Sequence, residues 1–324
     1  MVAGASPCRV KMRYYIFFGC PVMQQDIESL LTIRDFVRWG ASRFNEEGLF
    51  FGHGTDNALD EAAVLVLSAL SLPSDLTGAY FDCRVTASER ERILAILSQR
   101  IDERVPAAYL TNEAVFAGLK FYVDERVLVP RSPIAELIEN GFSPWVSSDS
   151  VGRVLDLCTG SGCIAIGCAH YFADASVDAV DISPRALDVA RINIERHQLT
   201  DRVEPILSDL FDGLKGRQYD LIVSNPPYVS LEEYSHLPVE YHREPILGLE
   251  AGRDGLDLIS RILAQGVDYL EPGGVMVVEV GSSAEALVSR YPDIPFMWLD
   301  FQRGGDGVFL LTAEELNEYR PFFS

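Results

Sequence analysis

The sequence predicts an α/β protein with a doubly wound, mostly parallel seven-stranded sheet and a smaller N-terminal helical domain. From residue 152 onward, short apolar and β-branched runs alternate with helical segments, as in strands that are buried on both faces. Residues 25–104 instead place their apolar side chains at helical spacing. A length of 324 residues suits two domains of this kind.

Three helical segments are expected near the N-terminus, at residues 25–45, 59–72 and 88–104. The second ends before Pro73 and the third before Pro106. Ser88 and Glu91 fit a capping box that opens the third helix. Residues 23–105 therefore form the predicted helical domain. Residues 1–22 are interpreted as a non-native or disordered extension, because their apolar run is short and lacks a signal-peptide cleavage site.

Residues 106–130 are predicted to be a hairpin linker, because 116–123 alternate in polarity around Gly118. Residues 131–324 then form the sheet domain. Ser183 and Pro184 fit the N-cap and first position of a helix. Five buried strands and a terminal hairpin around G-G-D-G at 304–307 make seven strands. The expected strands are 153–158, 176–181, 203–207, 219–224, 274–280, 296–301 and 308–312.

The formal net charge is −21, and most of it lies in residues 131–324, where 14 basic and 31 acidic residues leave −17. A DNA-binding protein normally presents a basic face, so we expect no direct DNA binding. An acidic body attracts basic partners, although it also serves solubility. No apolar run approaches the ~18–20 residues that span a membrane. Six cysteines without a C-x-x-C pair predict no metal site and fit a reducing cytoplasm.

The sequence D-L-C-T-G-S-G at 156–162 follows the first predicted strand of the sheet. Gly160 and Gly162 allow a sharp turn and a close approach to a ligand, and Thr159 lies in the same turn. Open α/β sheets bind ligands at the carboxyl ends of their strands. Asp156 would repel a pyrophosphate but would suit the ammonium group of a methionine moiety. The alternative is an ordinary turn between a strand and a helix.

Two more acids follow predicted strands. Asp181 ends the second strand and is positioned to accept hydrogen bonds from both ribose hydroxyls of a nucleoside, although it also fits a helix cap. Asp209, followed by Leu210 after the third strand, is a candidate acceptor for an adenine amino group, or a turn residue. With the turn at 156–162, these acids predict a nucleoside site.

The sequence N-P-P-Y, Asn225 to Tyr228, directly follows the fourth predicted strand. Pro226 and Pro227 have no N–H, so their carbonyls only accept hydrogen bonds. The Asn225 oxygen and the Pro226 carbonyl are able to accept the two hydrogens of a planar NH₂ group, and Tyr228 is able to stack on it. This arrangement orients a nitrogen for in-line methyl transfer. A rigid loop without chemistry is the alternative.

With these motifs, the chain resembles the class I, Rossmann-like S-adenosylmethionine-dependent methyltransferases, and within them the protein glutamine methyltransferases. DNA adenine methyltransferases share N-P-P-Y. The further similarity lies in V-L-V-P-R at 127–131 and H-R-E-P-I-L-G-L-E-A-G-R-D-G-L at 242–256. The resemblance implies S-adenosylmethionine as the methyl donor. It also implies substrate contacts within these motifs, at Arg131, Glu244 and Pro245.

Within this family, the chain is most similar to the branch that acts on large-subunit ribosomal protein L-three. Release-factor methyltransferases, which are an alternative, continue from the Pro-Arg with P-E-T-E, whereas this chain has P-R-S-P-I-A-E-L-I at 130–138. The sequences G-H-G-T-D-N at 52–57, Y-L-T-N at 109–112 and F-Y-V-D-E-R at 121–126 also resemble that branch. The resemblance implies N5-methylation of one glutamine before ribosome assembly.

Other classes remain as alternatives. A nucleic-acid adenine methyltransferase conflicts with the acidic C-terminal part, and a ribosome-assembly factor without turnover conflicts with the intact loop at 225–228. One glutamine is too small to identify a protein, so we expect residues 23–105 to recognise the substrate. Alternatively, this domain covers the sheet edge or mediates dimerisation.

Overall fold

The computed structural model describes residues 27–323, so the predicted extension at 1–22 lies outside the described residues. The described chain divides into two compact units. The first extends to Leu49 and resumes over Asn57–Glu103, and the second comprises Phe50–Asp56 and the chain from Arg104 onward. The short segment Phe50–Asp56 thus belongs to the second unit, although its neighbours in sequence belong to the first.

The first unit is helical and contains α2 (Ile33–Glu46), α3 (Ala58–Ala69), the 3₁₀ helix η2 (Gly78–Asp82) and α4 (Ala87–Glu103). Its buried core includes Phe36 and Phe44 of α2 and Leu97 of α4. Gly40 of α2 allows close packing, because a Cβ there would lie 3.3 Å from both Ala62 and Leu97. The buried guanidinium of Arg100 donates to Glu61 over 2.7 Å.

Two details of the helical prediction were wrong. The segment predicted as one helix at 25–45 is interrupted, and α2 begins after Thr32, which forms a capping box with Asp35. The cap of α4 is Thr86 rather than Ser88. Thr86 N–H donates to Glu89 Oε2 over 2.7 Å, and Thr86 Oγ1 accepts from Glu89 N–H over 3.4 Å. The same polar-to-acidic spacing occurs two residues earlier than predicted, and the helix uses that first copy.

The second unit is built on a seven-stranded sheet in the order β5-β4-β3-β6-β7-β9-β8. The strands β3 to β7 run parallel, and β9 pairs antiparallel with both β7 and β8, which confirms the predicted, mostly parallel sheet. The terminal hairpin is shorter than predicted, because its first strand has only two residues. The bounds are β3 (Arg153–Leu157), β4 (Ser176–Asp181), β5 (Val203–Leu207), β6 (Tyr219–Ser224), β7 (Leu270–Glu279), β8 (Met297–Trp298) and β9 (Val308–Thr312).

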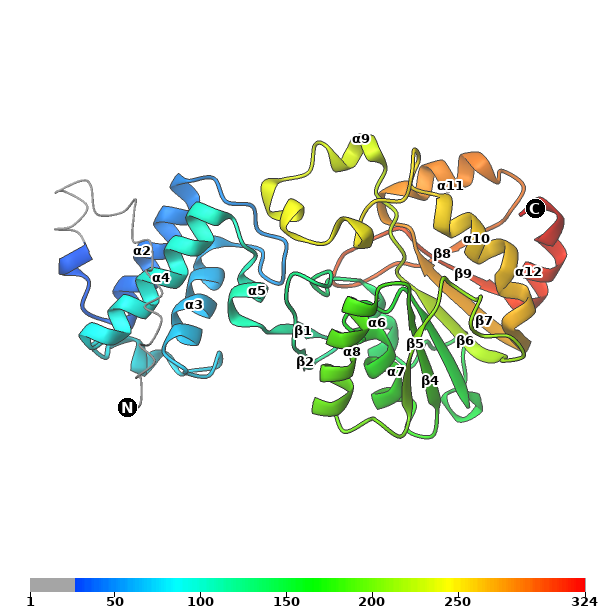
Figure 1. The fold of residues 1–324 in the computed structure, drawn as a ribbon, viewed down its shortest axis with the longest axis horizontal. Helices are drawn as coiled ribbons and strands as arrows, with labels where there is room; N and C mark the ends of the chain where they lie inside the picture. Colours follow the sequence, from blue (N-terminus) through cyan, green and yellow to red (C-terminus); the bar gives the residue numbers. More distant parts are fainter. Residues whose placement is uncertain (1–26, 324) are drawn as a thin grey trace, which may run out of the picture. The chain divides into compact units, whose positions relative to one another are not determined.

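Helices cover both faces of this sheet, with α7 and α8 on one side and α10 and α12 on the other (Figure 1). The remaining elements are a small hairpin, short helices and 3₁₀ turns. Their bounds are α5 (Ala107–Thr111), β1 (Ala114–Phe116), β2 (Leu119–Phe121), α6 (Ile134–Glu139), η3 (Ser148–Ser150), α7 (Cys163–Tyr171), α8 (Pro184–Arg196), α9 (Leu231–Tyr234), η4 (Val239–Arg243), η5 (Ile246–Gly248), α10 (Asp257–Gly266), η6 (Val267–Tyr269), η7 (Gly281–Ser283), α11 (Ala284–Arg290), α12 (Ala313–Tyr319) and η8 (Arg320–Phe322).

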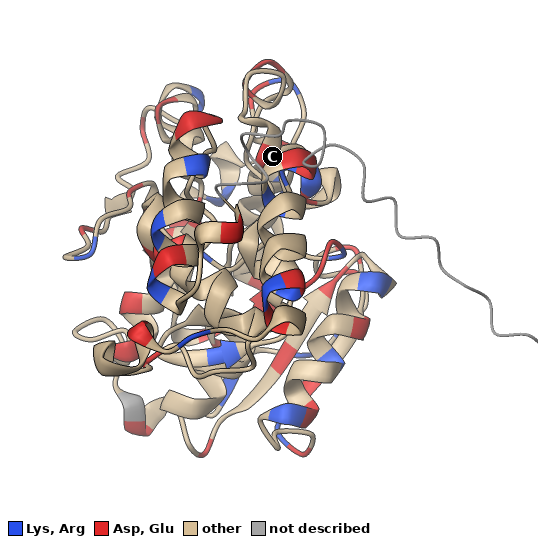
Figure 2. Ribbon diagram, turned by 90° about the vertical axis from the view of Figure 1, so that its left-hand side faces the viewer, with Lys and Arg blue, Asp and Glu red and all other residues tan. Residues whose placement is uncertain are grey.

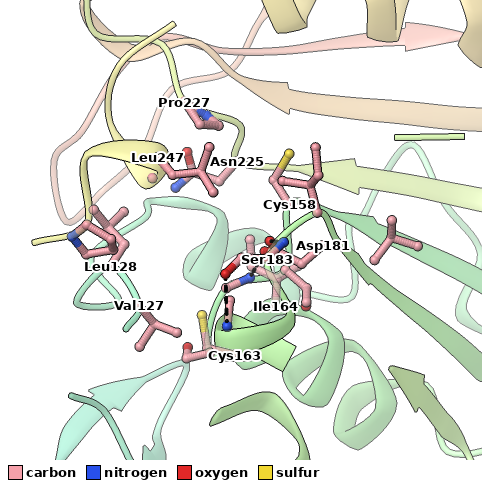
Figure 3. A pocket seen from close by; sticks show the side chains of 18 of the residues that line it. Val127, Leu128, Cys158, Cys163, Ile164, Asp181, Ser183, Asn225, Pro227 and Leu247 are labelled. Atoms are coloured by element: carbon pink, nitrogen blue, oxygen red, sulfur yellow. Dashed lines mark hydrogen bonds between the residues drawn. The ribbon is translucent and has the colours of Figure 1, made fainter. Parts of the chain in front are cut away.

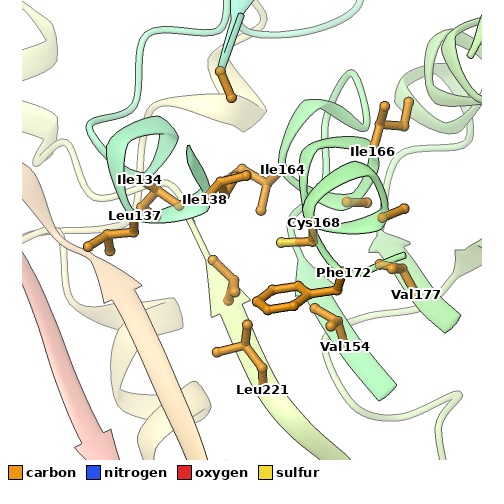
Figure 4. Packing of buried hydrophobic residues seen from close by; sticks show 14 of the residues in the cluster. Ile134, Leu137, Ile138, Val154, Ile164, Ile166, Cys168, Phe172, Val177 and Leu221 are labelled. Atoms are coloured by element: carbon orange, nitrogen blue, oxygen red, sulfur yellow. The ribbon is translucent and has the colours of Figure 1, made fainter. Parts of the chain in front are cut away.

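Neighbouring strand residues enter opposite cores, as expected for a sheet buried on both faces. Val154 of β3 packs with Phe172 and with helices α6 and α7 (Figure 4). The next residue, Leu155, packs with Ile259 of α10 in the other core. As predicted, Ser183 caps α8 and accepts from Ala186 N–H, with proline at the helix start. No helix among residues 27–323 is both long enough and apolar enough to cross a bilayer.

Candidate functional site

A cavity of about 210 Å³ lies at the carboxyl ends of strands β3, β4, β5 and β6. Asn225, Pro227 and Leu247 lie on one side of it, and Asp181 and Cys163 lie on another (Figure 3). The cavity thus brings together residues of all four predicted motifs, the turn at 156–162, Asp181, Asp209 with Leu210, and the loop at 225–228, with segments that are distant in sequence. Its lining includes Arg126, Val127, Leu128, Pro130, Arg131, Ser132, Cys158, Thr159, Gly160, Ser161, Asp181, Ser183, Ser208, Asp209, Leu210, Asn225, Pro227, Pro245, Leu247, Gly248, Leu258 and Arg261.

Asp156 is fully buried in β3 and does not itself line the cavity. Its Oδ2 accepts from Thr159 Oγ1 over 2.5 Å and from Ala165 N–H over 3.0 Å, so it joins the turn to helix α7. Its Oδ1 has no hydrogen-bond partner among the described residues. Burial raises the pKa of Asp156 to about 7. This buried acceptor is therefore suited to a cationic or donating group.

The two glycines of the turn have different roles. Gly160 lines the cavity at φ 55°, and a Cβ there would meet nothing within 4 Å. Gly162 precedes α7 at φ 80°, and a Cβ there would lie 3.3 Å from the Ala190 Cβ of α8. Gly160 is thus needed for the positive φ of the backbone beside the cavity. Gly162 also has a positive φ, and in addition it allows α7 and α8 to pack closely. Gly162 does not line the cavity.

Asp181, at the end of β4, connects two of the elements around the cavity. Its Oδ2 accepts from Gly160 N–H over 2.9 Å, and its Oδ1 accepts from Ser183 N–H over 2.8 Å. Burial raises the pKa of Asp181. A carboxylate has about four acceptor sites, so Asp181 retains acceptor capacity for a ligand in the cavity.

Asp209 and Leu210 also line the cavity, after β5. Asp209 Oδ1 lies 3.0 Å from Arg261 Nη1 of α10, and both side chains are partly exposed. Leu210 has φ 49° and is buried. No local feature of the sequence pointed to Arg261, because it lies far along the chain from Asp209.

The loop that follows β6 is fixed at both ends. Ser224 Oγ donates to the Leu157 carbonyl over 2.9 Å, and Ser283 Oγ donates to the Tyr228 carbonyl over 2.6 Å. Asn225 and Pro227 line the cavity, whereas Pro226 is buried outside its lining. The rigidity expected of two prolines is thus reinforced by hydrogen bonds to neighbouring segments.

Tyr228 does not line the cavity, and its hydroxyl donates to Glu279 Oε1 over 3.0 Å. The other oxygen of Glu279 accepts from Ser132 Oγ over 2.5 Å. Burial raises the pKa of both Tyr228 and Glu279. Glu279, at the end of β7, was not identified from the sequence, although it follows a buried strand as Asp181 does. The stacking of Tyr228 on a substrate remains a prediction.

Arg131, Glu244 and Pro245 do lie together. Arg131 and Pro245 line the cavity, but the Glu244 side chain has no exposed area. Glu244 accepts from Val129 N–H over 2.8 Å and from both terminal nitrogens of Arg131, over 2.7 and 2.9 Å. His53 Nε2 lies 3.5 Å from Glu244 Oε2. Glu244 is therefore enclosed by donors.

Although burial opposes ionisation, His53 and Arg131 together hold the pKa of Glu244 below its ordinary value. His53 reaches this place because Phe50–Asp56 packs on the segment around η4. Phe50 N–H donates to Glu240 Oε1 over 3.1 Å, and the His53 and Tyr241 ring centroids lie 4.7 Å apart. The sequence showed the motif at 52–57 but did not indicate that its histidine lies beside Glu244.

The chain is similar to known methyltransferases. The methyltransferase small domain family matches residues 142–238. A ribosomal protein uL3 glutamine methyltransferase of Francisella tularensis is 52% identical over 302 residues, which cover 93% of this chain and 96% of that protein. Its counterpart in Neisseria gonorrhoeae is 52% identical over 297 residues, covering 91% of this chain and 99% of that protein. Among solved structures, the hMettl16 catalytic domain in complex with MAT2A 3'UTR hairpin 6 has a TM-score of 0.48 and 18% identity, over 69% of this chain and 80% of that one.

The sheet order and the matched domain define a class I, Rossmann-like methyltransferase fold. The chain belongs to the family of ribosomal protein uL3 glutamine methyltransferases. This confirms the family, the enzyme class and the fold that the sequence predicted.

Proposed function

We propose that the protein transfers a methyl group from S-adenosylmethionine to the side-chain amide nitrogen of one glutamine in ribosomal protein uL3, the L-three protein of the large subunit. One observation carries this proposal: the loop at 225–228 contributes Asn225 and Pro227 to the same cavity as Asp181 and the turn at 156–162. An acceptor site and a nucleoside site therefore adjoin. The names of the two relatives, each about half identical, support the choice of substrate.

The residues around the cavity fit S-adenosylmethionine. Asp181 retains acceptor sites for ribose hydroxyls, and Asp209 is able to accept from an adenine amino group. The unpartnered Oδ1 of Asp156 would be stabilised electrostatically by an ammonium group near the turn. Gly160 leaves this side of the cavity open. When bound, S-adenosylmethionine supplies a methyl group attached to a sulfonium. The sulfur keeps the electron pair of the sulfur–carbon bond that breaks.

The chain's own residues orient the acceptor. In the proposed complex the Asn225 oxygen and the Pro226 carbonyl accept the two amide hydrogens, which aims the nitrogen lone pair along the line of transfer. The nitrogen gains the methyl group and releases one proton to water. A methylated amide nitrogen is acidic in the transition state, so no residue has to act as a strong base.

The acidic charge supports action on the free basic protein in the cytoplasm, before assembly. Acidic residues are spread over many helices and loops, with basic residues among them (Figure 2). A net charge of −21 steers a basic protein toward the enzyme and repels folded ribosomal RNA. The rate on free uL3 should therefore fall as salt rises.

A methyl-incorporation assay that offers purified uL3, an RNA and a DNA separately tests this function. We expect one methyl group on one glutamine of uL3, located by mass spectrometry, and no transfer to the nucleic acids. Faster modification of intact large subunits than of free uL3 would contradict action before assembly. Transfer to adenine would favour a nucleic-acid enzyme instead.

We also propose that the helical unit recognises uL3, because the reacting amide alone does not identify a protein. Glu91 and Asp102 of α4 are both exposed and, eleven residues apart, lie on the same side of the helix. The double variant E91K/D102K should raise the KM for uL3 while leaving cofactor affinity unchanged. The control D293K/E318K makes the same charge change at exposed positions of the second unit. Equal losses in both variants would show that only net charge matters.

A further inference from the structure

The guanidinium of Arg131 is held between a buried carboxylate and the cavity. Its Nη1 donates to Glu244 Oε1 over 2.7 Å and to the Val129 carbonyl over 3.2 Å, and its Nη2 donates to Glu244 Oε2 over 2.9 Å. Its Cζ lies 5.1 Å from the centre of the Tyr241 ring. A two-point pairing of this kind fixes the plane of the guanidinium as well as its charge.

This pairing leaves part of Arg131 available. A guanidinium has five N–H groups, and three are used. The Nε–H and the second Nη2–H have no hydrogen-bond partner among residues 27–323. Arg131 lines the cavity and 24% of its side chain is exposed, whereas Glu244 has no exposed area. The unused N–H donors thus belong to Arg131, which a ligand in the cavity is able to reach, whereas Glu244 is out of reach.

Arg131 lies at the acceptor end of the cavity. The next residue, Ser132, donates to Glu279, as Tyr228 does. The partner of Arg131, Glu244, lies three residues before Leu247, which lies beside Asn225 in the cavity (Figure 3). Tyr228 ends the same loop that places Asn225 in the cavity. The cations elsewhere in the lining are already engaged, since Arg126 binds Asp124 and Arg261 pairs with Asp209.

A primary amide offers two N–H donors and one carbonyl oxygen. The proposed function matches the donors with the Asn225 oxygen and the Pro226 carbonyl but leaves the carbonyl oxygen without a partner. A buried carbonyl without a donor is costly. We propose that Arg131 donates to the carbonyl oxygen of the acceptor glutamine, and that Glu244 positions Arg131 for this. This inference rests on the proposed function and makes Arg131 a specificity-determining residue.

The consequence is selection of an amide in one orientation. A flipped amide would place its NH₂ group against the guanidinium and its oxygen against the Asn225 oxygen, so both ends would be mismatched. A glutamate would satisfy Arg131 with one oxygen but would direct the other at two carbonyl acceptors. The pair of donor and acceptors therefore distinguishes glutamine from its nearest isostere.

The test must separate substrate recognition from simple pairing with Glu244. Arg131→Met alone would leave a buried carboxylate unpaired and is expected to weaken the fold. The double variant R131M/E244Q removes both charges, while the amide oxygen introduced by Glu244→Gln remains an acceptor for Val129 N–H. R131K is the second variant, since lysine keeps the charge against Glu244 but lacks the fork.

The control is Arg153→Met. Arg153 also lies over a tyrosine ring, at 5.4 Å from that of Tyr219, and beside a carboxylate, at 3.5 Å from Asp178, but it begins β3 rather than lining the cavity. For each protein, the melting temperature, cofactor affinity by calorimetry, and kcat and KM on free uL3 are measured. We expect R131M/E244Q and R131K to bind S-adenosylmethionine normally and to lose roughly 10- to 100-fold in kcat/KM, with R153M unchanged.

Wild-type kcat/KM in R131M/E244Q would overturn the proposal, because a residue that only pairs with Glu244 is dispensable once both charges are removed. If that double variant does not fold, full activity of R131K overturns the proposal instead. Failure of the proposed function has a different signature: the wild-type protein itself would then leave the glutamines of uL3 unmodified. That outcome would also refute the role of Arg131.

Discussion

Asp156→Asn is the substitution whose effect the structure defines most closely. The Asp156 side chain is completely buried, with one oxygen bound by Thr159 and Ala165 and the other without a partner among the described residues. An asparagine keeps the accepting oxygen and puts a neutral NH₂ group in the place of the unpartnered one. The substitution therefore removes a titration while preserving the contacts of the turn.

The expected magnitude follows from the pKa, which burial raises from 3.8 to about 7. Between these values the folded protein holds a proton that the unfolded chain has released. The protonated form of Asp156 therefore contributes stability that is fully present below about pH 4, and that is lost progressively as pH rises toward and through about 7. At about 1.4 kcal/mol per pH unit, the full loss is at most roughly 4 kcal/mol. Asp156→Asn lacks this loss.

The assay is denaturant unfolding of both proteins from about pH 5 to about pH 8, without ligand. The difference in unfolding free energy between wild type and variant isolates Asp156, because the other titrating groups are common to both. We expect the wild type to lose stability relative to the variant as pH rises. In the presence of S-adenosylmethionine the slope should shrink, because its ammonium stabilises the ionised carboxylate.

Parallel pH profiles of the two proteins without ligand would refute the reasoning about burial. A pH slope that the cofactor does not change would instead refute the electrostatic interaction of Asp156 with an ammonium group. Calorimetry gives an independent check, since Asp156→Asn should bind S-adenosylmethionine roughly tenfold more weakly through the lost charge.

Three further predictions test the site. Asp181→Asn should weaken cofactor binding by about 1.5–3 kcal/mol, because the ribose hydroxyls lose a charged acceptor, and an unchanged calorimetric affinity would contradict the nucleoside site. Tyr228→Phe should lower the unfolding free energy by about 1–3 kcal/mol by removing the donor to buried Glu279, and equal stability would show that this hydrogen bond is immaterial. Gly162→Ala should destabilise more than Gly160→Ala, since both have positive φ but only Gly162 has a neighbour 3.3 Å from the added Cβ; the reverse order in thermal unfolding would disprove this.

The sheet was predictable because its strands are short apolar runs that end in polar residues. Asp181, Asp209 and Asn225 each follow such a run, and the carboxyl ends of parallel strands meet at one edge. Their placement around one cavity is therefore a consequence of the order of elements alone. The hairpin predicted around Gly118 is present, although β1 and β2 have only three residues each.

The partners of these residues were not predictable, because they depend on contacts between distant segments. Ser132 and Glu279 are 147 residues apart, and Arg131 and Glu244 are 113 apart. Periodicity indicates which side chains are buried but not which buried polar groups meet. The position of His53 could not be predicted for the same reason. In sequence its loop lies between two helices of the first unit, but in the structure the loop belongs to the second unit.

The acids around the cavity differ in what offsets the cost of their burial, and this difference supports the proposed assignment of its two ends. At the acceptor end, Glu244 is balanced by Arg131 and keeps a pKa below its ordinary value, and the charge of Arg131 also opposes the rise that burial causes in the pKa of Glu279. Burial raises the pKa of both Asp156 and Asp181, and no cation among the described residues offsets that rise. A cationic ligand relieves these two acids, whereas a neutral amide requires only the directed hydrogen bonds of the other end. A positively charged methyl donor and an uncharged glutamine are the pair of ligands that this division of charge favours.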